Sequence, residues 1–269
     1  MISPIKAFQT EVWKYYKTHK RDLPWRKTKN PYRILVSEVM LQQTQVERVK
    51  VYYTAFLKKF PDIETLAQAK LSEVLTMWKG LGYNRRAVNL KKCAEEIVNA
   101  GGKFPKEFPA LLALPGIGPS TAGALMNFSY NIPTAFIETN IRSVYLHFFF
   151  KNKTGIDDKE IFKLVEKTQD MKNSREWYYA LYDYGVMLKK TIGNPNIRSK
   201  HHKKQSTFKG SNRELRAKML FYILENKSTT AKQIAKNTKR SLEEVEKNLT
   251  TFTKEGLVIK KGAYVRIVK

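Results

Sequence analysis

Glu38 is the residue whose surroundings point most directly to acid–base chemistry. It lies in PYRILVSEVMLQQTQV, where helical spacing would place Ile34 and Leu41 on the same face. Burial on an apolar face penalises a charged carboxylate and raises its pKa. An acid that keeps its proton near neutral pH can protonate a leaving group, so Glu38 is a candidate general acid. The structural alternative is an ion pair with Arg26 or Arg33.

A glycine-rich stretch, LPGIGPSTAGA, predicts a hairpin that binds phosphate. Gly116 and Gly118 would let backbone amides come close to a ligand. A helix that begins near Ser120 and Thr121 would add the positive end of its dipole. Further on, Glu138 and Asn140 stand in an otherwise apolar run, TAFIETNI. The alternative is an ordinary corner between two helices with a surface carboxylate, because short glycine-rich motifs recur by chance.

The elements that position these residues are predicted to be helices. Residues 5–19 place Phe8, Val12 and Tyr16 at helical spacing, and LPWRKTKNPYR after them is typical of a connector. Further helices are predicted as two over 32–59, then over 62–68 and 71–78, from the end of the Gly80–Tyr83 turn to about Val98, near 106–112, and over 139–150, 158–168 and 173–190. No segment up to residue 190 indicates a strand, so the first domain is predicted to be all-α.

The composition changes near the end of this domain. Residues 189–210 contain seven Lys and Arg and no Asp or Glu, which fits either a basic loop along DNA or a solvated linker. Residues 212–269 then follow the order helix, helix, helix, hairpin, and Ser241 and Glu244 have the spacing of a capping box. We predict a basic linker over 191–211 and a small α+β winged-helix domain over 212–269, with 241–254 as its recognition helix. Winged helices also bind proteins, so this domain has two kinds of candidate partner.

The charge of the chain indicates a polyanionic partner. Fifty Lys and Arg against 24 Asp and Glu give a formal net charge of +26, which points most simply to nucleic acid. A membrane surface is the competing partner, but no segment has the length and purity of a spanning helix. The N-terminal residues lack the apolar core of a signal peptide, and a single cysteine, Cys93, excludes an internal disulfide. We expect a cytoplasmic monomer.

Five motifs together carry a resemblance to a known family. LPWR, PYRILVSEVMLQQTQV, KGLGYNRRAVNL, GGKFP and LPGIGPSTAGA occur in this order. Over about residues 5–190 the chain resembles the helix–hairpin–helix DNA glycosylases, and among them the MutY-type adenine DNA glycosylases, which remove adenine mispaired with guanine or 8-oxoguanine. The resemblance implies an all-α helix–hairpin–helix glycosylase domain over 1–190, and double-stranded DNA with a mismatch or lesion as its partner.

The resemblance also implies roles for individual residues. Glu38 would protonate the adenine and handle the water, and Arg26 would support the site. Gln42 and Tyr83 would wedge into the duplex, because a base inside the stack must be flipped out before it can be reached. The other residues expected to contact DNA or substrate are Gln43, Thr44, Gly116, Gly118, Ser120, Thr121 and Asn140.

The chain departs from the family pattern at three places. Glu138-Thr139-Asn140 stands where the family has Asp-Gly-Asn; a carboxylate that steadies a cationic sugar is kept, but Glu is one methylene longer and a poorer helix N-cap than Asp. Most of the family binds an iron–sulfur cluster through four cysteines, which a chain with one cysteine cannot do, so no such cofactor is expected. The family's C-terminal domain that senses 8-oxoguanine is replaced by the predicted winged helix.

Ser120 bears on the mechanism. Bifunctional relatives of the endonuclease III type carry there a Lys that attacks the sugar, and this chain has no Lys between Leu111 and Asn131. Hydrolysis by water is the remaining route, so we predict a monofunctional adenine DNA glycosylase with Glu38 and Glu138 as catalytic residues and no metal ligands. The alternatives are a thymine or uracil mismatch glycosylase and a non-catalytic DNA-binding regulator. The sequence leaves open whether the hairpin carbonyls hold a monovalent cation.

Overall fold

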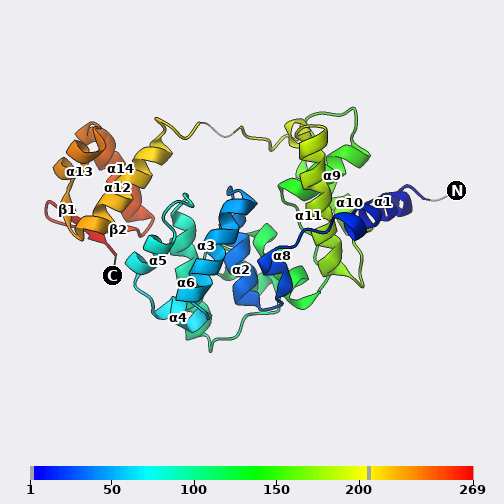
Figure 1. Ribbon diagram of the computed structural model, residues 1–269, viewed down its shortest axis with the longest axis horizontal. Helices are drawn as coiled ribbons and strands as arrows, with labels where there is room; N and C mark the ends of the chain where they lie inside the picture. The colour runs from blue at the N-terminus through cyan, green and yellow to red at the C-terminus, as the bar shows by residue number, and fades with distance from the viewer. Residues whose placement is uncertain (1–2, 205–206, 269) are drawn as a thin grey trace. The chain divides into compact units, whose positions relative to one another are not determined.

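Helices form most of the structure, a computed structural model that describes residues 3–204 and 207–268 (Figure 1). Contacts divide the chain into two compact units. The first holds the described residues up to Glu38 together with Pro105–Ala113 and Ile117–Lys204, and the second holds Val39–Phe104, Leu114–Gly116 and the described residues from Thr207 onward. The boundary therefore falls inside helix α2 (Pro31–Leu41) and inside the glycine-rich hairpin. The predicted domains, which follow chain order, stay a prediction.

Proline fixes where two helices of the first unit begin. α1 (Pro4–His19) starts at a proline behind the capping Ser3, and α8 (Pro119–Tyr130) starts at a proline behind Gly118. The fixed φ of proline suits a first helical turn, where its missing N–H leaves no hydrogen bond unmade. The other elements of this unit are α7 (Phe108–Ala113), α9 (Thr139–Phe149), α10 (Asp158–Thr168), α11 (Ser174–Thr191) and two short 3-10 helices, η1 (Pro24–Lys27) and η2 (Pro195–Arg198).

Aromatic side chains fill the core of the first unit around α11, which packs along α9 and α1. The ring centroid of Phe8 lies 5.0–5.7 Å from those of Tyr145, Phe148, Phe149 and Trp177. Tilted and edge-on ring pairs add stability beyond the apolar area that they bury. Gly185 brings α11 against the start of α9, since a Cβ at this position would lie 2.5 Å from the Asn140 carbonyl oxygen. The absence of a side chain at Gly185 therefore sets the distance between α11 and the N-terminal end of α9, where the predicted site residues lie.

The second unit combines helices from the middle of the chain with the C-terminal elements. Its middle helices are α3 (Val46–Lys59), α4 (Ile63–Gln68), α5 (Leu71–Met77) and α6 (Arg85–Asn99). α6 packs on α4 and α5, and Trp78, which is fully buried, packs edge-on against Phe56 of α3 at 5.9 Å between ring centroids. This packing holds the turn between α5 and α6, which carries Tyr83.

Residues 212–267 form three helices and a small antiparallel sheet. The elements are α12 (Asn212–Asn226), β1 (Thr229–Thr230), α13 (Ala231–Thr238), α14 (Leu242–Lys254), β2 (Val258–Lys261) and β3 (Tyr264–Ile267), with strand order β1-β3-β2. The predicted capping box is confirmed, because Ser241 and Glu244 cap α14 reciprocally. The sequence analysis missed β1, where Thr229 pairs with Val265, since two residues carry no alternation. The second of the three helices therefore begins at Ala231, directly after this strand.

Part of the predicted basic linker is folded against α9. The Asn196 side-chain amide donates to the Thr139 carbonyl at 2.9 Å and to the Ser143 hydroxyl at 2.6 Å. Arg198 donates to the carbonyls of Leu146, Phe150 and Lys151. A guanidinium at the last carbonyls of a helix satisfies acceptors that lack a partner within it and offsets its negative end. This part of the linker therefore supports α9.

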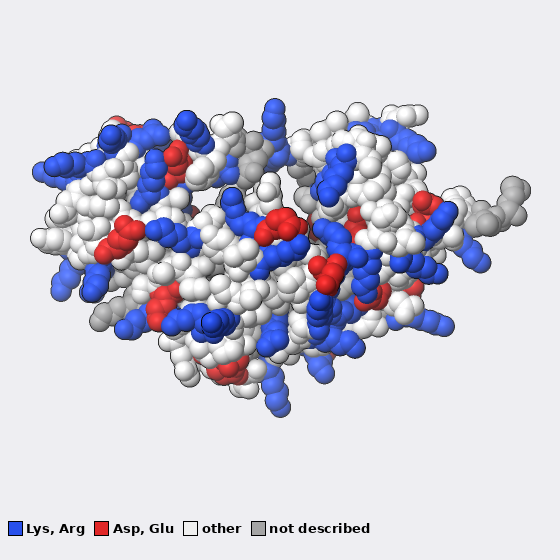
Figure 2. Space-filling model, in the orientation of Figure 1, with Lys and Arg blue, Asp and Glu red and all other residues white. Residues whose placement is uncertain are grey.

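Basic side chains dominate the surface that Figure 2 shows, with fewer acidic side chains among them. This distribution follows from the net charge of +26, and such a surface attracts polyanions. Within the described residues, no helix is both long enough and apolar enough to cross a membrane.

Candidate active site

Glu38 lies on α2, on a helix face that also carries the fully buried Ile34 and Leu35. Burial raises the pKa of Glu38 to about 8, and the charge of Glu138 adds to the rise. A hydrogen bond from the Tyr182 hydroxyl and the charge of Arg26 act in the opposite direction. A carboxyl group with this pKa keeps its proton at neutral pH, which a general acid requires.

Glu138 caps helix α9. Its Oε1 accepts hydrogen bonds from the backbone amides of Asn140 at 2.7 Å and Ile141 at 2.8 Å. Its Oε2 accepts from the Thr139 hydroxyl and from the Asn140 side-chain amide, both at 3.1 Å. The additional methylene of Glu, compared with Asp, therefore does not prevent the cap. Burial raises the pKa of Glu138, and these hydrogen bonds and the charge of Lys189 counteract that rise.

The structure brings the two predicted catalytic carboxylates into one site. The two side chains lie close enough together for the charge of Glu138 to raise the pKa of Glu38. Two acids that share a low-dielectric site titrate as a pair, and a single proton between them is favoured near neutral pH. Glu138 has backbone amides that stabilise its charge, so the proton belongs on Glu38. The site then offers an acid and a carboxylate side by side.

Tyr182, which the sequence analysis missed, connects α11 to this pair. Its hydroxyl donates to Glu38, and its ring packs edge-on against Phe128 and Phe136 at 5.6 and 6.4 Å between centroids. Burial and the two carboxylates raise the pKa of Tyr182 well above its ordinary value. Tyr182 therefore remains a neutral donor that orients Glu38.

Arg26 is held in a buried ion pair with Asp183, a second residue that the sequence analysis missed. The guanidinium donates to both carboxylate oxygens at 2.7 Å, and the two side chains are 4% and 1% exposed. It also lies 4.5 Å from the ring centroid of Tyr179. A bidentate pair of this kind fixes the arginine. The charge of Arg26 acts on Glu38 from this position and lowers its pKa. The alternative, an ion pair between Arg26 and Glu38, is not formed, because Arg26 pairs with Asp183.

Lys189 is the third group on α11 that reaches this site. Its Nζ donates to Asn140 Oδ1 at 2.9 Å, so Asn140, which was expected to contact DNA, links Lys189 to the α9 cap. Burial lowers the pKa of Lys189, and the charge of Glu138 opposes that change. The charged forms of Lys189 and Glu138 therefore stabilise one another.

The glycine-rich hairpin joins α7 to α8, as predicted. Gly116 has a φ of +76°, and a Cβ there would lie 2.6 Å from that of Asn89, so glycine is required on both counts. Gly118 is the N-cap of α8 and has no atom within 4 Å of the missing Cβ. The space in front of this helix end is open to a ligand. Ser120 is half-buried, whereas Thr121 is only 6% exposed, so Ser120 offers the more accessible hydroxyl.

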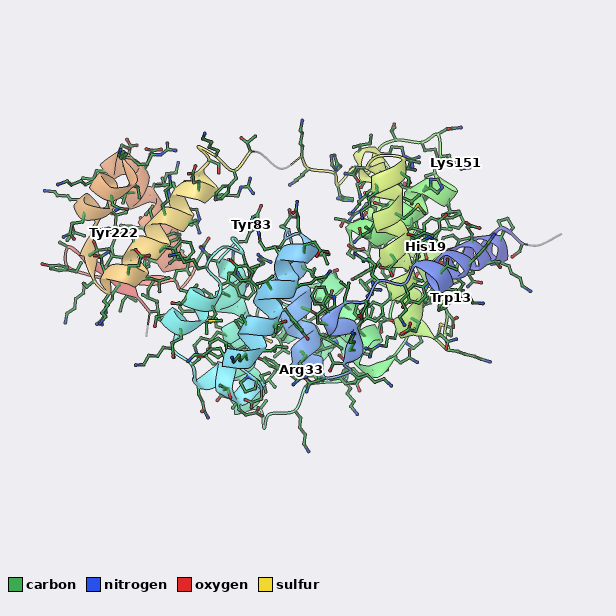
Figure 3. All side chains as sticks on the ribbon, viewed as in Figure 1. Trp13, His19, Arg33, Tyr83, Lys151 and Tyr222 are labelled. Atoms are coloured by element: carbon green, nitrogen blue, oxygen red, sulfur yellow. The ribbon has the colours of Figure 1, made fainter. Side chains whose placement is uncertain are left out.

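The remaining predicted contact residues lie in the second unit, on two turns. Gln42 and Gln43 are exposed and Thr44 is half-buried at the end of α2. Tyr83 is 41% exposed and projects from the turn before α6 (Figure 3). Gln43 and Tyr83 have φ values of +58° and +48°. This conformation costs a side-chain-bearing residue on the order of 1–3 kcal/mol and is concentrated at functional sites.

Arg86, which the sequence analysis did not single out, ties these two turns together. Its guanidinium donates at 2.6–3.2 Å to Val39, Met40 and Thr44 at the end of α2 and to Leu81 and Gly82 in the other turn. Burial lowers its pKa to about 10, so the side chain stays charged at neutral pH. Arg86 thereby fixes the exposed Gln42 and Tyr83 relative to one another.

The part of the chain that the structure describes contains neither a group of metal ligands nor a reactive thiol. Its His, Cys, Asp and Glu side chains form no group of three or more that could hold a metal ion. Cys93 is buried, and burial raises the pKa of its thiol to about 12. A protonated, buried thiol is neither a good ligand nor a nucleophile.

Comparison with known proteins identifies the family. Residues 36–170, which include Glu38, the hairpin and Glu138, match the HhH-GPD superfamily of base excision DNA repair proteins. The chain belongs to this superfamily. HhH-GPD membership confirms the family that the five motifs predicted, and the mostly helical fold agrees with it.

Two curated relatives are similar to this chain over about two thirds of its length. They are named adenine DNA glycosylase, come from Buchnera aphidicola subsp. Baizongia pistaciae (strain Bp) and subsp. Acyrthosiphon pisum (strain APS), and are 37% and 34% identical over 189 and 180 residues. The matches cover 70% and 65% of this chain but 54% and 51% of the relatives, so the chain spans about half of their length. A solved structure described as a thermostable thymine-DNA glycosylase aligns with a TM-score of 0.61 and 28% identity, over 68% of this chain and 87% of that one.

Proposed function

We propose that this chain is a monofunctional DNA glycosylase that hydrolyses the N-glycosidic bond of adenine paired with guanine or 8-oxoguanine. The observation that supports the proposal most directly is that Glu38 keeps its proton near neutral pH beside Glu138, the carboxylate that caps α9. The similarity to curated adenine DNA glycosylases supports adenine as the base.

In the first step, the Glu38 carboxyl group donates its proton to a ring nitrogen of adenine. The bond between C1′ and the base then breaks, its electron pair leaves with the base, and neutral adenine is released. Protonation lowers the barrier because an uncharged purine is a better leaving group than its anion. The sugar becomes cationic, and the Glu138 carboxylate stabilises this developing charge.

In the second step, water adds to C1′ and completes the hydrolysis. Glu38 is now a carboxylate and takes a proton from the water, which restores the acid for the next cycle. Glu138 acts as the carboxylate of the pair in this mechanism, because backbone amides and the nearby Lys189 oppose the rise in its pKa that burial causes. Tyr182 keeps Glu38 oriented in both protonation states.

The exposed turns and the hairpin provide the contacts that base flipping requires. A base inside the duplex cannot be reached, and side chains inserted into the stack help to extrude it. Gln42 and Tyr83 stand on exposed turns, with Gln43 and Thr44 beside them, as such a role demands. The backbone amides that follow Gly116 and Gly118, together with the Ser120 hydroxyl, can donate hydrogen bonds to a phosphate of the DNA backbone. The C-terminal elements from residue 212 onward match a winged helix in their order, and we propose that they add phosphate contacts.

Adenine fits this site better than thymine or uracil. The pyrimidine bases leave as anions, for which hydrogen-bond donors to the ring oxygens would serve better than a proton on a nitrogen. Ser120 favours hydrolysis over strand cleavage, because it offers no amine at the position where endonuclease III relatives carry their Lys.

The test is a panel of single-mismatch duplexes with free base quantified. We expect adenine release opposite guanine and opposite 8-oxoguanine, and product strands that break only after alkali or heat. Borohydride added during turnover should trap little covalent protein–DNA complex. Release of thymine or uracil opposite guanine, with adenine untouched, would overturn the choice of base, and efficient trapping would overturn the monofunctional mechanism.

A further inference from the structure

The second unit contains a groove that starts at the two turns proposed to open the duplex, where it is lined by Gln42, Gln43, Thr44 and Tyr83, and extends from them to α12. Its cavity volume is about 1160 Å³. One wall is formed by the end of α2 and the turn before α6, and the other by α12 and the residues just before it. The lining residues used below are Arg48, Tyr83, Arg85, Phe208, Arg213 and Arg216.

The charge of the groove is strongly positive. Of its arginines, Arg216 is paired with Glu255 at 2.5 Å, whereas Arg85 is exposed and Arg48 is exposed and donates to the Gly80 carbonyl at 3.4 Å. Arginine offers a planar fork of donors that matches phosphate oxygens. The groove therefore suits an anion that bears oxygen acceptors.

Exposed aromatic rings accompany the arginines. Phe208 is 55% exposed and Tyr83 is 41% exposed. Arg213 donates to the Tyr83 hydroxyl at 3.0 Å, and its guanidinium carbon lies 5.7 Å from the Tyr83 ring centroid. Flat aromatic and guanidinium surfaces beside cationic groups are the chemistry of single-stranded nucleic-acid sites, where bases stack and phosphates are neutralised.

We propose that this groove binds an unpaired nucleotide of DNA. The phosphates lie against Arg48 and Arg85, and the base stacks on Phe208 and on the guanidinium of Arg213. In a paired duplex the faces of each base are covered by the neighbouring bases, so they are not available to stack on Phe208 and Arg213. The inference rests on the proposed function in one respect, because the Tyr83 turn is taken to open the duplex beside the groove. It gives α12 a role in selecting opened DNA over paired DNA.

The experiment compares two duplexes of the same sequence, one fully paired and one with a single unpaired 2-aminopurine. The full-length protein should bind the second about tenfold more tightly and quench its fluorescence, because stacking on an aromatic ring is worth about tenfold or more per base. Phe208→Ala and Arg213→Lys should remove most of this preference and leave affinity for the paired duplex within about twofold. Arg213→Lys keeps the charge and loses the planar fork.

Tyr264→Ala and Arg266→Lys are the matched controls, because both residues are exposed on β3 and neither lines the groove. We expect them to keep the preference and the quenching. Equal weakening of both duplexes by the groove variants would overturn the proposal, as would loss of the preference in the controls. Deoxynucleoside monophosphate that competes as well as the opened duplex would also overturn it, in favour of a free nucleotide.

The assay separates this inference from the proposed function, since it scores binding and involves no base release. If the mismatch panel yields no free base while the preference for the unpaired nucleotide stands, the proposed function fails and the groove assignment holds. If adenine is released while Phe208→Ala leaves the preference intact, the groove assignment fails alone.

Discussion

Glu38 and Glu138 are chemically alike, and their surroundings give them different tasks. Burial penalises the charged form of Glu38 by more than the hydrogen bond from Tyr182 stabilises it, so the pKa of Glu38 is raised. Glu138 receives two backbone amides at the positive end of a helix and a lysine charge nearby, so its charged form is stabilised. Environment alone can separate an acid from a carboxylate in this way.

Glu38→Gln keeps the shape and most hydrogen bonding of the side chain but cannot donate the proton. We expect single-turnover adenine release to fall by at least about a hundredfold, as for removal of a general acid, with binding to mismatched DNA within about threefold of the unchanged protein. Glu11→Gln, at an exposed position on α1, is the matched control and should behave as the unchanged protein. Near-normal release by Glu38→Gln would contradict its assignment as the acid.

The pH dependence follows from the raised pKa of about 8 for Glu38. The acid works only when protonated, so the rate of base release should decline as pH rises through about 8. Tyr182→Phe removes a hydrogen bond that favours the charged form, so this decline should move to higher pH. Rates are measured in single turnover at saturating protein, and a decline at the same pH in both proteins would exclude the contact as a cause.

At the scale of single elements, α11 organises the site from a distance in sequence. It contributes Tyr182, Asp183 and Lys189 to three different members of the site on α2, η1 and α9. Gly185 lets the helix approach Asn140 closely enough for these contacts. A change in α11 should therefore affect chemistry although none of its residues belongs to the glycine-rich hairpin.

The sequence predicted most helices within a few residues, because apolar spacing and helix caps are local signals. It predicted Glu38 because a carboxylate on an apolar helical face is unusual. Asp183 offers the same signal in YYALYDYG and could have been found by it. Tyr182 and Lys189 could not have been predicted, because their roles depend on contacts with α2 and α9, which are distant in sequence. In the sequence Lys189 is only one of several basic residues in a basic segment.

The hairpin allows a test in which two neighbouring glycines separate folding from binding. Gly116→Ala meets both a positive φ and the Asn89 side chain, so we expect a loss of about 1 kcal/mol or more in the free energy of unfolding as well as weaker DNA binding. Gly118→Ala meets no atom within 4 Å, so its stability should stay within about 0.5 kcal/mol.

Gly118→Ala should nevertheless lower DNA affinity about tenfold, because a methyl group would keep a phosphate from the first amides of α8 and lose a charge-assisted hydrogen bond. Unfolding by denaturant and binding at fixed salt measure the two effects. Unchanged affinity in Gly118→Ala would show that the hairpin does not contact the DNA backbone.

At the scale of the whole molecule, the basic charge is shared between the two units. Residues 205–269 alone contain 15 Lys and Arg against 6 Asp and Glu. The part of the linker around Asn196 and Arg198 supports α9, so a cut after residue 190 would damage the fold of the first unit. A cut after Lys204 avoids those contacts.

Truncation after Lys204 should weaken binding to paired and mismatched duplexes and reduce the slope of log affinity against log salt, because fewer phosphates are neutralised. Far-UV circular dichroism would check that the helices of the first unit remain, and titrations at several salt concentrations would give the slope. An unchanged slope with altered mismatch preference would show that the C-terminal elements read the base pair and contribute little charge.

Gln43 and Tyr83 both adopt a backbone conformation that glycine would tolerate with less strain. Random substitution would relieve this strain most simply by placing glycine at either position, at no cost to the surrounding turn. A lineage that retains the larger side chains accepts a standing loss of stability, which is sustainable only where the side chain does work that outweighs it. The two strained turns therefore mark the surface on which directed evolution for stability would most readily erode activity.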